Sequence, residues 1–208
     1  MEHKIIVAGI GPGAPEYLVP AAKQYIDSAG VLLGSRRALD TFAKPGTKTM
    51  AITGDIQAVL DFIKEESRHT EVVVMVSGDP GYYSLLAALR NVFSLSQLQV
   101  IPGISSMQLA FARLALPWQT ARLLSLHGRG PEEQDLHYEI GAVLGILTDT
   151  AYTSQAIARL LLARGWPAET KVYCCARLSY EDEEIATATL GTIGTIEDFS
   201  HCIMVVTA

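Results

Sequence analysis

Three short apolar segments, each running directly into a loop of glycine and proline, constrain the fold of this 208-residue chain more than any other feature. Short segments rich in valine and isoleucine are typical of strands buried on both faces of a parallel sheet. The three segments with their loops are KIIVA–GIGPG at 4–13, EVVVMVS–GDPG at 71–81 and LQVI–PG at 98–103. We therefore expect each loop to lie at the carboxyl end of a strand.

Helical patterns alternate with these strands through the first half of the chain. Two further strands are expected at 31–33 and 47–52. The expected helices are 21–28, 36–42, 55–66, a segment from the GDPG loop to about 92, and 104–114. Gly54-Asp55 supplies a capping region for the third of these helices. This alternation predicts an α/β domain with a mostly parallel sheet and helices on its faces.

The second half of the chain predicts a different sheet. Strands are expected at 122–126, 142–147, 171–175, 185–190 and 202–206, with one helix at 152–164. The last two strands are separated by TIGTIEDFS, which is too short for a crossover helix, so some strands must pair antiparallel. We therefore expect two α/β domains, 1–114 and 122–208, joined by a linker at 115–121, with a mixed sheet in the second.

Composition narrows the class of protein. The chain carries a formal charge of -6, which argues against a nucleic-acid-binding surface. None of its three cysteines has zinc-ligand spacing, so we expect reduced thiols and no metal. There is no apolar leader and no apolar run of about 18 residues, so we expect a soluble, cytoplasmic protein that does not bind a membrane.

The loops themselves predict a ligand site. In open parallel sheets ligands bind beyond the carboxyl ends of the strands, and glycine lets the backbone approach a ligand closely. The first loop is not a dinucleotide fingerprint, because Pro12, Pro15 and Pro20 delay the helix that should open within it. A Walker loop is absent as well. The ligand is therefore not an ordinary phosphate-cradled nucleotide.

The motifs resemble the tetrapyrrole methylase family, whose members show a GxGPG loop, a GDP-type loop and a PGxS-type segment in this order. Four strings are similar to one branch of that family, which methylates carbon 5 of cobalt-precorrin-7 or precorrin-6Y in cobalamin biosynthesis. They are LGSRR at 33–37, SGDPGYYS at 77–84, PGISSMQLAFARL at 102–114 and SLHGR at 125–129. The resemblance extends from residue 4 to about residue 190.

This resemblance implies an S-adenosylmethionine-dependent methyltransferase with two α/β domains, commonly a homodimer, acting on a corrinoid tetrapyrrole. A separate partner would then methylate carbon 15 and decarboxylate a side chain. The positions implied to bind S-adenosylmethionine are Pro12, Ser77, Gly78, Asp79, Tyr82, Ser105, Ser106, Leu147 and Thr148. For Asp79 there is a structural alternative, because aspartate often caps a following helix.

The substrate would carry acetate and propionate arms, for which arginine is the natural partner. The candidate substrate-binding residues are Arg36, Arg37, Arg113 and Arg129. His127 is the candidate base for the proton of the methylated carbon, since the pKa of histidine suits proton transfer near neutrality.

One departure from the family concerns the stretch VYCCARLSYEDEEI, where relatives usually carry an acidic residue near Ala176; Glu181, Glu183 and Glu184 could compensate. Several alternatives stay open at this point. The acceptor could be another macrocycle carbon, ribosomal RNA or a modified histidine of an elongation factor. The chain could also bind S-adenosylmethionine without catalysing a reaction.

Overall fold

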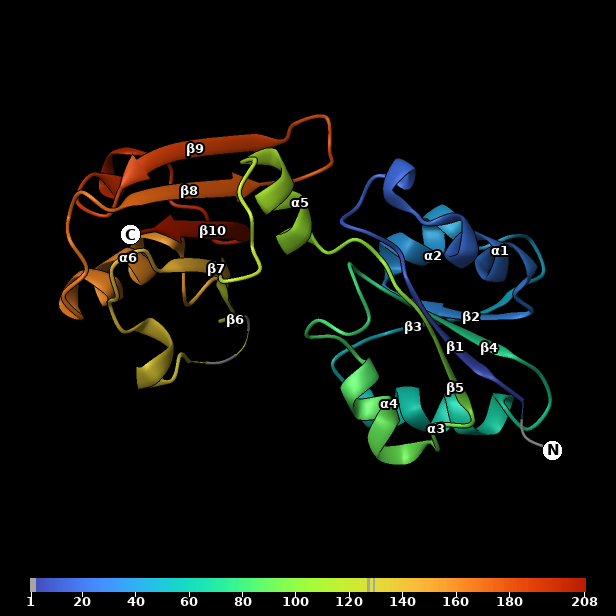
Figure 1. Ribbon diagram of the computed structural model, residues 1–208. Helices are drawn as coiled ribbons and strands as arrows, with labels where there is room; N and C mark the ends of the chain where they lie inside the picture. Colours follow the sequence, from blue (N-terminus) through green and yellow to red (C-terminus); the bar gives the residue numbers. More distant parts are fainter. Residues whose placement is uncertain (1–2, 127, 129) are drawn as a thin grey trace. The chain divides into compact units, whose positions relative to one another are not determined.

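The computed structural model describes residues 3–126, 128 and 130–208. These residues form two compact units, one ending at Ser105 and one beginning at Ser106 (Figure 1). Within the described ranges, no helix combines the length and the apolar character that crossing a membrane requires.

The first unit is built on a parallel sheet in the order β3-β2-β4-β1-β5. Its strands are β1 (Ile5–Gly9), β2 (Val31–Gly34), β3 (Lys48–Ala51), β4 (Val72–Val76) and β5 (Leu98–Ile101). The strands β1, β2 and β4 are fully buried, as expected where helices cover both faces. The predicted parallel sheet is confirmed.

Helices cover both faces of this sheet (Figure 1). On one face lie α1 (Pro20–Ser28) and α2 (Arg36–Phe42), which pack on Ile6 and its neighbours. On the other lie α3 (Ile56–Glu66) and α4 (Leu86–Val92), which pack on Ile5 and its neighbours. A short 3-10 turn, η1 (Pro15–Tyr17), precedes α1. The cap predicted for α3 is present, since the Asp55 side chain accepts a hydrogen bond from the amide of Ala58 (3.1 Å).

The second unit is built on a mixed sheet in the order β6-β7-β10-β8-β9. β6 pairs parallel with β7, whereas β7–β10, β10–β8 and β8–β9 pair antiparallel. The elements are α5 (Ser106–Arg113), β6 (Arg122–Ser125), η2 (Glu133–Leu136), β7 (Val143–Leu147), α6 (Ser154–Ala163), β8 (Lys171–Ala176), β9 (Glu184–Thr189), η3 (Ile193–Thr195) and β10 (Cys202–Thr207). The expected mixed sheet is confirmed, but the last two strands do not pair with each other, because β8 lies between β9 and β10 and pairs antiparallel with both.

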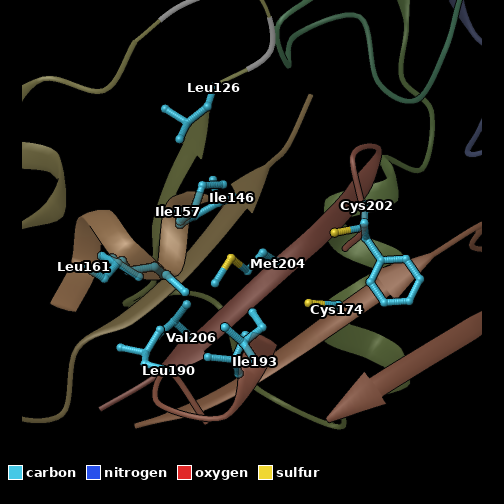
Figure 2. Packing of buried hydrophobic residues seen from close by; sticks show 14 of the residues in the cluster. Leu126, Ile146, Ile157, Leu161, Cys174, Leu190, Ile193, Cys202, Met204 and Val206 are labelled. Carbon is cyan, nitrogen blue, oxygen red and sulfur yellow. The ribbon is translucent and has the colours of Figure 1, made fainter. Parts of the chain in front are cut away.

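The core of the second unit lies between one face of its sheet and α6 (Figure 2). Ile146 of β7 and Met204 of β10 project from the sheet, and Ile157 and Leu161 project from the helix; all four side chains are fully buried. Because both sheet and helix bury a continuous apolar face here, the second unit has a core of its own.

The helix α5 packs on the opposite face of this sheet, against β7 and β10. Gly145 in the middle of β7 makes this possible: a Cβ atom there would lie 2.6 Å from Met107 Sδ and 2.8 Å from a ring carbon of Phe111. The sequence had assigned residues 106–113 to the first domain. The structure places them in the second unit, and the predicted linker at 115–121 follows α5 within that unit.

Candidate active site

The three glycine and proline loops meet at one edge of the first unit, because the strands that precede them, β4, β1 and β5, are neighbours in the sheet. The first two loops pair directly. The amide of Gly78 donates to the carbonyl of Gly11 (2.8 Å), and the two residues form an antiparallel bridge. The loops are therefore fixed to one another by backbone contacts.

Glycine is required at this edge because the backbones pack against each other. A Cβ atom on Gly9 would lie 2.6 Å from the carbonyl oxygen of Gly78 and 2.7 Å from the amide nitrogen of Gly103. A Cβ atom on Gly103 would lie 2.2 Å from that same oxygen. Gly78 itself has a φ of +67°, a conformation that favours glycine. Backbone packing therefore accounts for Gly9 and Gly103, and backbone conformation accounts for Gly78, without a ligand.

Asp79 joins the second loop to the third. One carboxylate oxygen accepts a hydrogen bond from the amide of Gly81 (2.8 Å), and the other accepts one from the amide of Gly103 (3.1 Å). The following helix begins only at Leu86, and its N-cap residue is Leu85. The capping alternative for Asp79 is therefore wrong, and the carboxylate organises the edge on which the predicted ligand would lie.

Among the described residues, Tyr82 carries a buried side-chain polar atom that lacks a hydrogen-bond partner. Its hydroxyl oxygen is inaccessible to solvent and makes no hydrogen bond there. Burial, with a smaller contribution from the neighbouring Tyr83, raises the pKa of Tyr82 well above its usual value, so the phenol stays protonated. A buried hydroxyl without a partner is costly, and a ligand that accepts a hydrogen bond would relieve that cost.

A pocket of about 230 Å³ opens beside these loops at the carboxyl ends of β1 to β4. Its lining is mainly apolar and includes Ile10, Ile52 and Met75, with the serines at 35, 77 and 84. The hydroxyl of Ser35 caps α2 by accepting from the amide of Ala38 (3.2 Å). The first two residues of that helix are the exposed candidates Arg36 and Arg37. They directly follow Ser35, which lines the pocket.

The remaining cofactor candidates fall into two groups. Pro12 and Ser77 lie in the first two loops, and the Cα of Ser105 lies 3.3 Å from the Cβ that a side chain at Gly78 would have. These residues share the edge of the first unit. Ser106 is the first residue of α5 and, with Leu147 and Thr148, belongs to the second unit.

A family profile described as Tetrapyrrole (Corrin/Porphyrin) Methylases matches residues 4–194. The chain belongs to the tetrapyrrole methylase family. The predicted family and fold are thereby confirmed.

Several relatives of this methylase are informative. A protein of Methanocaldococcus jannaschii named probable cobalt-precorrin-7 C(5)-methyltransferase is 29% identical over 95% of this chain and 94% of its own length. The cobalt-precorrin-7 C(5)-methyltransferase of Salmonella typhimurium is 34% identical over 77% of this chain and 79% of its own length. A solved structure, the cobalamin biosynthesis precorrin-6Y methylase of Archaeoglobus fulgidus, superposes with a TM-score of 0.77 at 25% identity, covering 99% of this chain and 98% of that one.

In the second unit of the methylase, the Thr148 hydroxyl makes hydrogen bonds within the protein. The side chain is buried, and its Oγ1 accepts a hydrogen bond from the amide of Cys202 (2.8 Å) and donates one to the carbonyl of Ser200 (3.1 Å). Its own amide donates to the carbonyl of Cys202 (3.2 Å). The Thr148 hydroxyl thus joins the end of β7 to the start of β10, and a role in cofactor binding stays a prediction.

Asp149 is a residue that the sequence analysis missed. This buried carboxylate accepts hydrogen bonds from the amides of Gly128 (2.8 Å), Ala151 (2.8 Å) and Tyr152 (2.7 Å). It thereby connects the loop after β6 with the turn after β7. Aspartate at the start of a turn that follows a strand is a known signature of such side-chain-to-backbone bonds, and that signal was available in the sequence.

The substrate candidates have different outcomes. Arg113 forms a bidentate ion pair with Glu183, so this guanidinium already has a carboxylate partner inside the protein. His127 and Arg129 lie outside the described residues, and their roles stay predictions.

Proposed function

We propose that this protein transfers a methyl group from S-adenosylmethionine to carbon 5 of cobalt-precorrin-7 in cobalamin biosynthesis, releasing S-adenosylhomocysteine. The observation that carries the proposal is the extent of the match: 95% of this chain aligns with 94% of the M. jannaschii relative. The Salmonella relative bears the same substrate and carbon in its name. Both α/β units of the present chain thus have a counterpart in proteins named for this reaction.

The chemistry asks for positioning more than for a reactive side chain. The bond between the sulfonium sulfur and the methyl carbon breaks, its electron pair stays on sulfur, and the macrocycle carbon forms the new bond and gives up a proton. Alignment of donor and acceptor contributes much of the rate in such a transfer. His127 is the proposed acceptor of the proton, because it follows β6 in the SLHGR segment.

We propose the edge of the first unit as a binding place for S-adenosylmethionine, the co-substrate. The residues proposed to bind it in the first unit are Pro12, Ser77, Gly78, Asp79, Tyr82 and Ser105. In the second unit the proposed residues are Ser106, Leu147 and Thr148. The solvent-inaccessible, protonated Tyr82 hydroxyl has a free donor for an acceptor atom of this ligand. In a related structure, the uroporphyrin-III C-methyltransferase of Thermus thermophilus, the bound molecule is S-adenosylhomocysteine; that enzyme is 23% identical.

The pocket beside these loops suits one part of the corrinoid. Its volume of about 230 Å³ is below the range of about 300–1,000 Å³ that holds a drug-sized ligand, so it fits a peripheral arm or one edge of the ring. Arg36 and Arg37 at the start of α2 supply charge for the carboxylate arms. Arg129 is proposed for the same task, and Arg113 is a weaker candidate because it is paired with Glu183.

A second candidate is methylation of another carbon of the same kind of macrocycle. A cobalt-precorrin-4 C(11)-methyltransferase of M. jannaschii is 27% identical over 92% of this chain and 80% of its own length. Relatives that methylate different carbons share this fold, so the acceptor carbon has to be identified by experiment.

Further predictions concern assembly. The precorrin-6Y C(5,15)-methyltransferase [decarboxylating] of a Sinorhizobium species aligns with 98% of this chain, which corresponds to half of that relative. We expect a separate enzyme to methylate carbon 15 and to decarboxylate the side chain. A homodimer and a cytoplasmic location also stay predictions, and light scattering of the purified protein tests the first.

The deciding experiment is turnover with S-adenosylmethionine carrying a ¹³C-labelled methyl group and with cobalt-precorrin-7 as acceptor. We expect a product heavier by one methyl group, with the label at carbon 5 in the carbon NMR spectrum. Label at carbon 11 of a cobalt-precorrin-4 acceptor, without reaction at carbon 5, would favour the second candidate. Binding of S-adenosylhomocysteine without turnover of any precorrin would indicate a non-catalytic binding protein.

A further inference from the structure

Arg113 and Glu183 join two segments of the second unit that are 70 residues apart in the sequence. Nε of Arg113 donates to one carboxylate oxygen of Glu183 (2.6 Å), and Nη2 donates to the other (3.2 Å). Such a two-point contact fixes orientation as well as distance. The side chains are 37% and 20% exposed, so solvent screens the pair only in part. The pair holds the last residue of α5 against the segment 177–183, which links β8 to β9.

The segment 177–183 needs such a contact, because its backbone is unusual. Arg177 and Ser179 both have positive φ, at 49° and 75°, and neither is glycine. A non-glycine residue in this conformation is strained and persists only where its surroundings enforce it. The Glu183 carboxylate supplies part of that enforcement, since it also accepts a hydrogen bond from the amide of Ser179 (2.8 Å).

Both segments that the pair joins adjoin proposed cofactor residues. The helix α5 begins at Ser106. The strand β8 ends at Ala176, which pairs with Cys202 of β10, and the Cys202 amide donates to Thr148. The end of β8 and the end of β7 therefore lie at the same edge of the sheet, and the segment 177–183 extends from it.

We propose that Arg113 and Glu183 form a positioning pair that holds α5 and the segment 177–183 in the geometry that S-adenosylmethionine requires. Arg113 then acts inside the protein rather than on a substrate carboxylate. This inference rests on the proposed function, because it concerns how the segments next to the proposed cofactor residues of the second unit are held in place for binding.

The same segment offers a matched control. Arg177 and Asp182 also form an ion pair, but their side chains are 61% and 60% exposed and the contact stays within the segment. An exposed pair of this kind contributes little. Asp182→Asn therefore removes one carboxylate from the same segment without touching the connection to α5.

The test is titration of S-adenosylhomocysteine into the full chain, compared for wild type, Glu183→Gln, Arg113→Met, the double variant and Asp182→Asn. We expect Glu183→Gln and Arg113→Met each to weaken binding by about three- to tenfold. Without the ion pair, the segment 177–183 must be ordered when the ligand binds, and this conformational cost lowers the affinity. The double variant should be no weaker than either single one, because both changes break the same contact. Asp182→Asn should bind like wild type. Arg113→Lys, a milder change, covers the case in which Arg113→Met fails to fold, and should weaken binding less than Arg113→Met does.

Hydrogen exchange supplies a second readout on the same proteins. Amides of 177–183 should exchange faster in Glu183→Gln and keep wild-type rates in Asp182→Asn. Wild-type affinity in Glu183→Gln, or single effects that multiply in the double variant, would overturn the positioning role while leaving the methyltransferase assignment intact. Failure of folded wild-type protein to bind S-adenosylhomocysteine would instead overturn the assignment itself, and this inference with it.

Discussion

The two units of this methylase hold their strand-end loops by different means. In the first unit, Gly9, Gly78 and Gly103 bring three backbones into direct contact, and the Asp79 carboxylate adds hydrogen bonds to two loop amides. In the second unit, the contacts described here come from carboxylates: Asp149 accepts hydrogen bonds from three loop amides, and Glu183 accepts one besides its arginine. Backbone packing tolerates no added atom, whereas side-chain contacts can be weakened in steps. The two edges should therefore respond differently to substitution.

The largest effect is expected for Gly103→Ala. The new Cβ would lie 2.2 Å from the carbonyl oxygen of Gly78, and backbone cannot yield as the end of a side chain can. We expect a loss of about 3 kcal/mol in the free energy of unfolding, measured by urea denaturation. Gly30→Ala is the control, because nothing lies within 4 Å of its Cβ position, and it should stay within about 0.5 kcal/mol of wild type. Equal losses in the free energy of unfolding for Gly103→Ala and Gly30→Ala would contradict the role of backbone packing at Gly103.

Asp149→Ala should give the next largest effect. It removes the acceptor of three backbone amides around a buried position, and hydrogen bonds to a charged group contribute more than neutral ones. We expect a loss of about 2 kcal/mol by the same denaturation experiment. Asp55→Ala, which removes the exposed cap of α3 in the first unit, should cost about 1 kcal/mol. A cost at Asp149 no greater than that at Asp55 would contradict the role given to the second-unit carboxylate.

Tyr82→Phe separates binding from stability at the first edge. Removal of a buried hydroxyl that lacks a partner in the described structure should raise the free energy of unfolding by about 1 kcal/mol. The same change should weaken binding of S-adenosylhomocysteine several-fold, because the proposed donor is gone. Thermal unfolding and calorimetric titration of one protein sample measure both. A variant that is both less stable and unchanged in affinity would show that the hydroxyl has a structural partner.

The smallest effect concerns pH. Hydrogen bonding from Arg113 lowers the pKa of Glu183 below its ordinary value of 4.5. A carboxylate with a lowered folded-state pKa contributes stability above the unfolded-state pKa and loses it as pH falls through the folded-state pKa. We expect wild type to exceed Glu183→Gln by up to about 1 kcal/mol between pH 5 and 8, limited by the partial exposure of Arg113. The difference should shrink below about pH 4.5; a difference that grows there would contradict this sign.

The sequence predicted the first unit well because its signals are local. Valine-rich strands and the loops that follow them are contiguous, and the order β3-β2-β4-β1-β5 then brings three of those loops together. The start of α4 at Leu86 came later than expected, since Asp79 binds loop amides instead of capping a helix. The predicted family followed from these same strings.

What the sequence missed depends on contacts between distant residues. A short apolar helix such as α5 has the same pattern whichever sheet it covers. Its packing on β7 depends on the distant Gly145, whose missing side chain leaves space for Met107 and Phe111. Arg113 looked like a substrate ligand because its partner Glu183 lies 70 residues away.

The central claim is that the glycine-loop edge of the first unit binds S-adenosylmethionine. Hydrogen exchange with and without saturating S-adenosylhomocysteine tests it directly, because a bound ligand protects the amides that it covers. We predict protection at 9–13, 77–84 and 102–106, the three loops joined by Gly78 and Asp79. Absence of binding, or protection confined to segments away from these loops, would contradict the account.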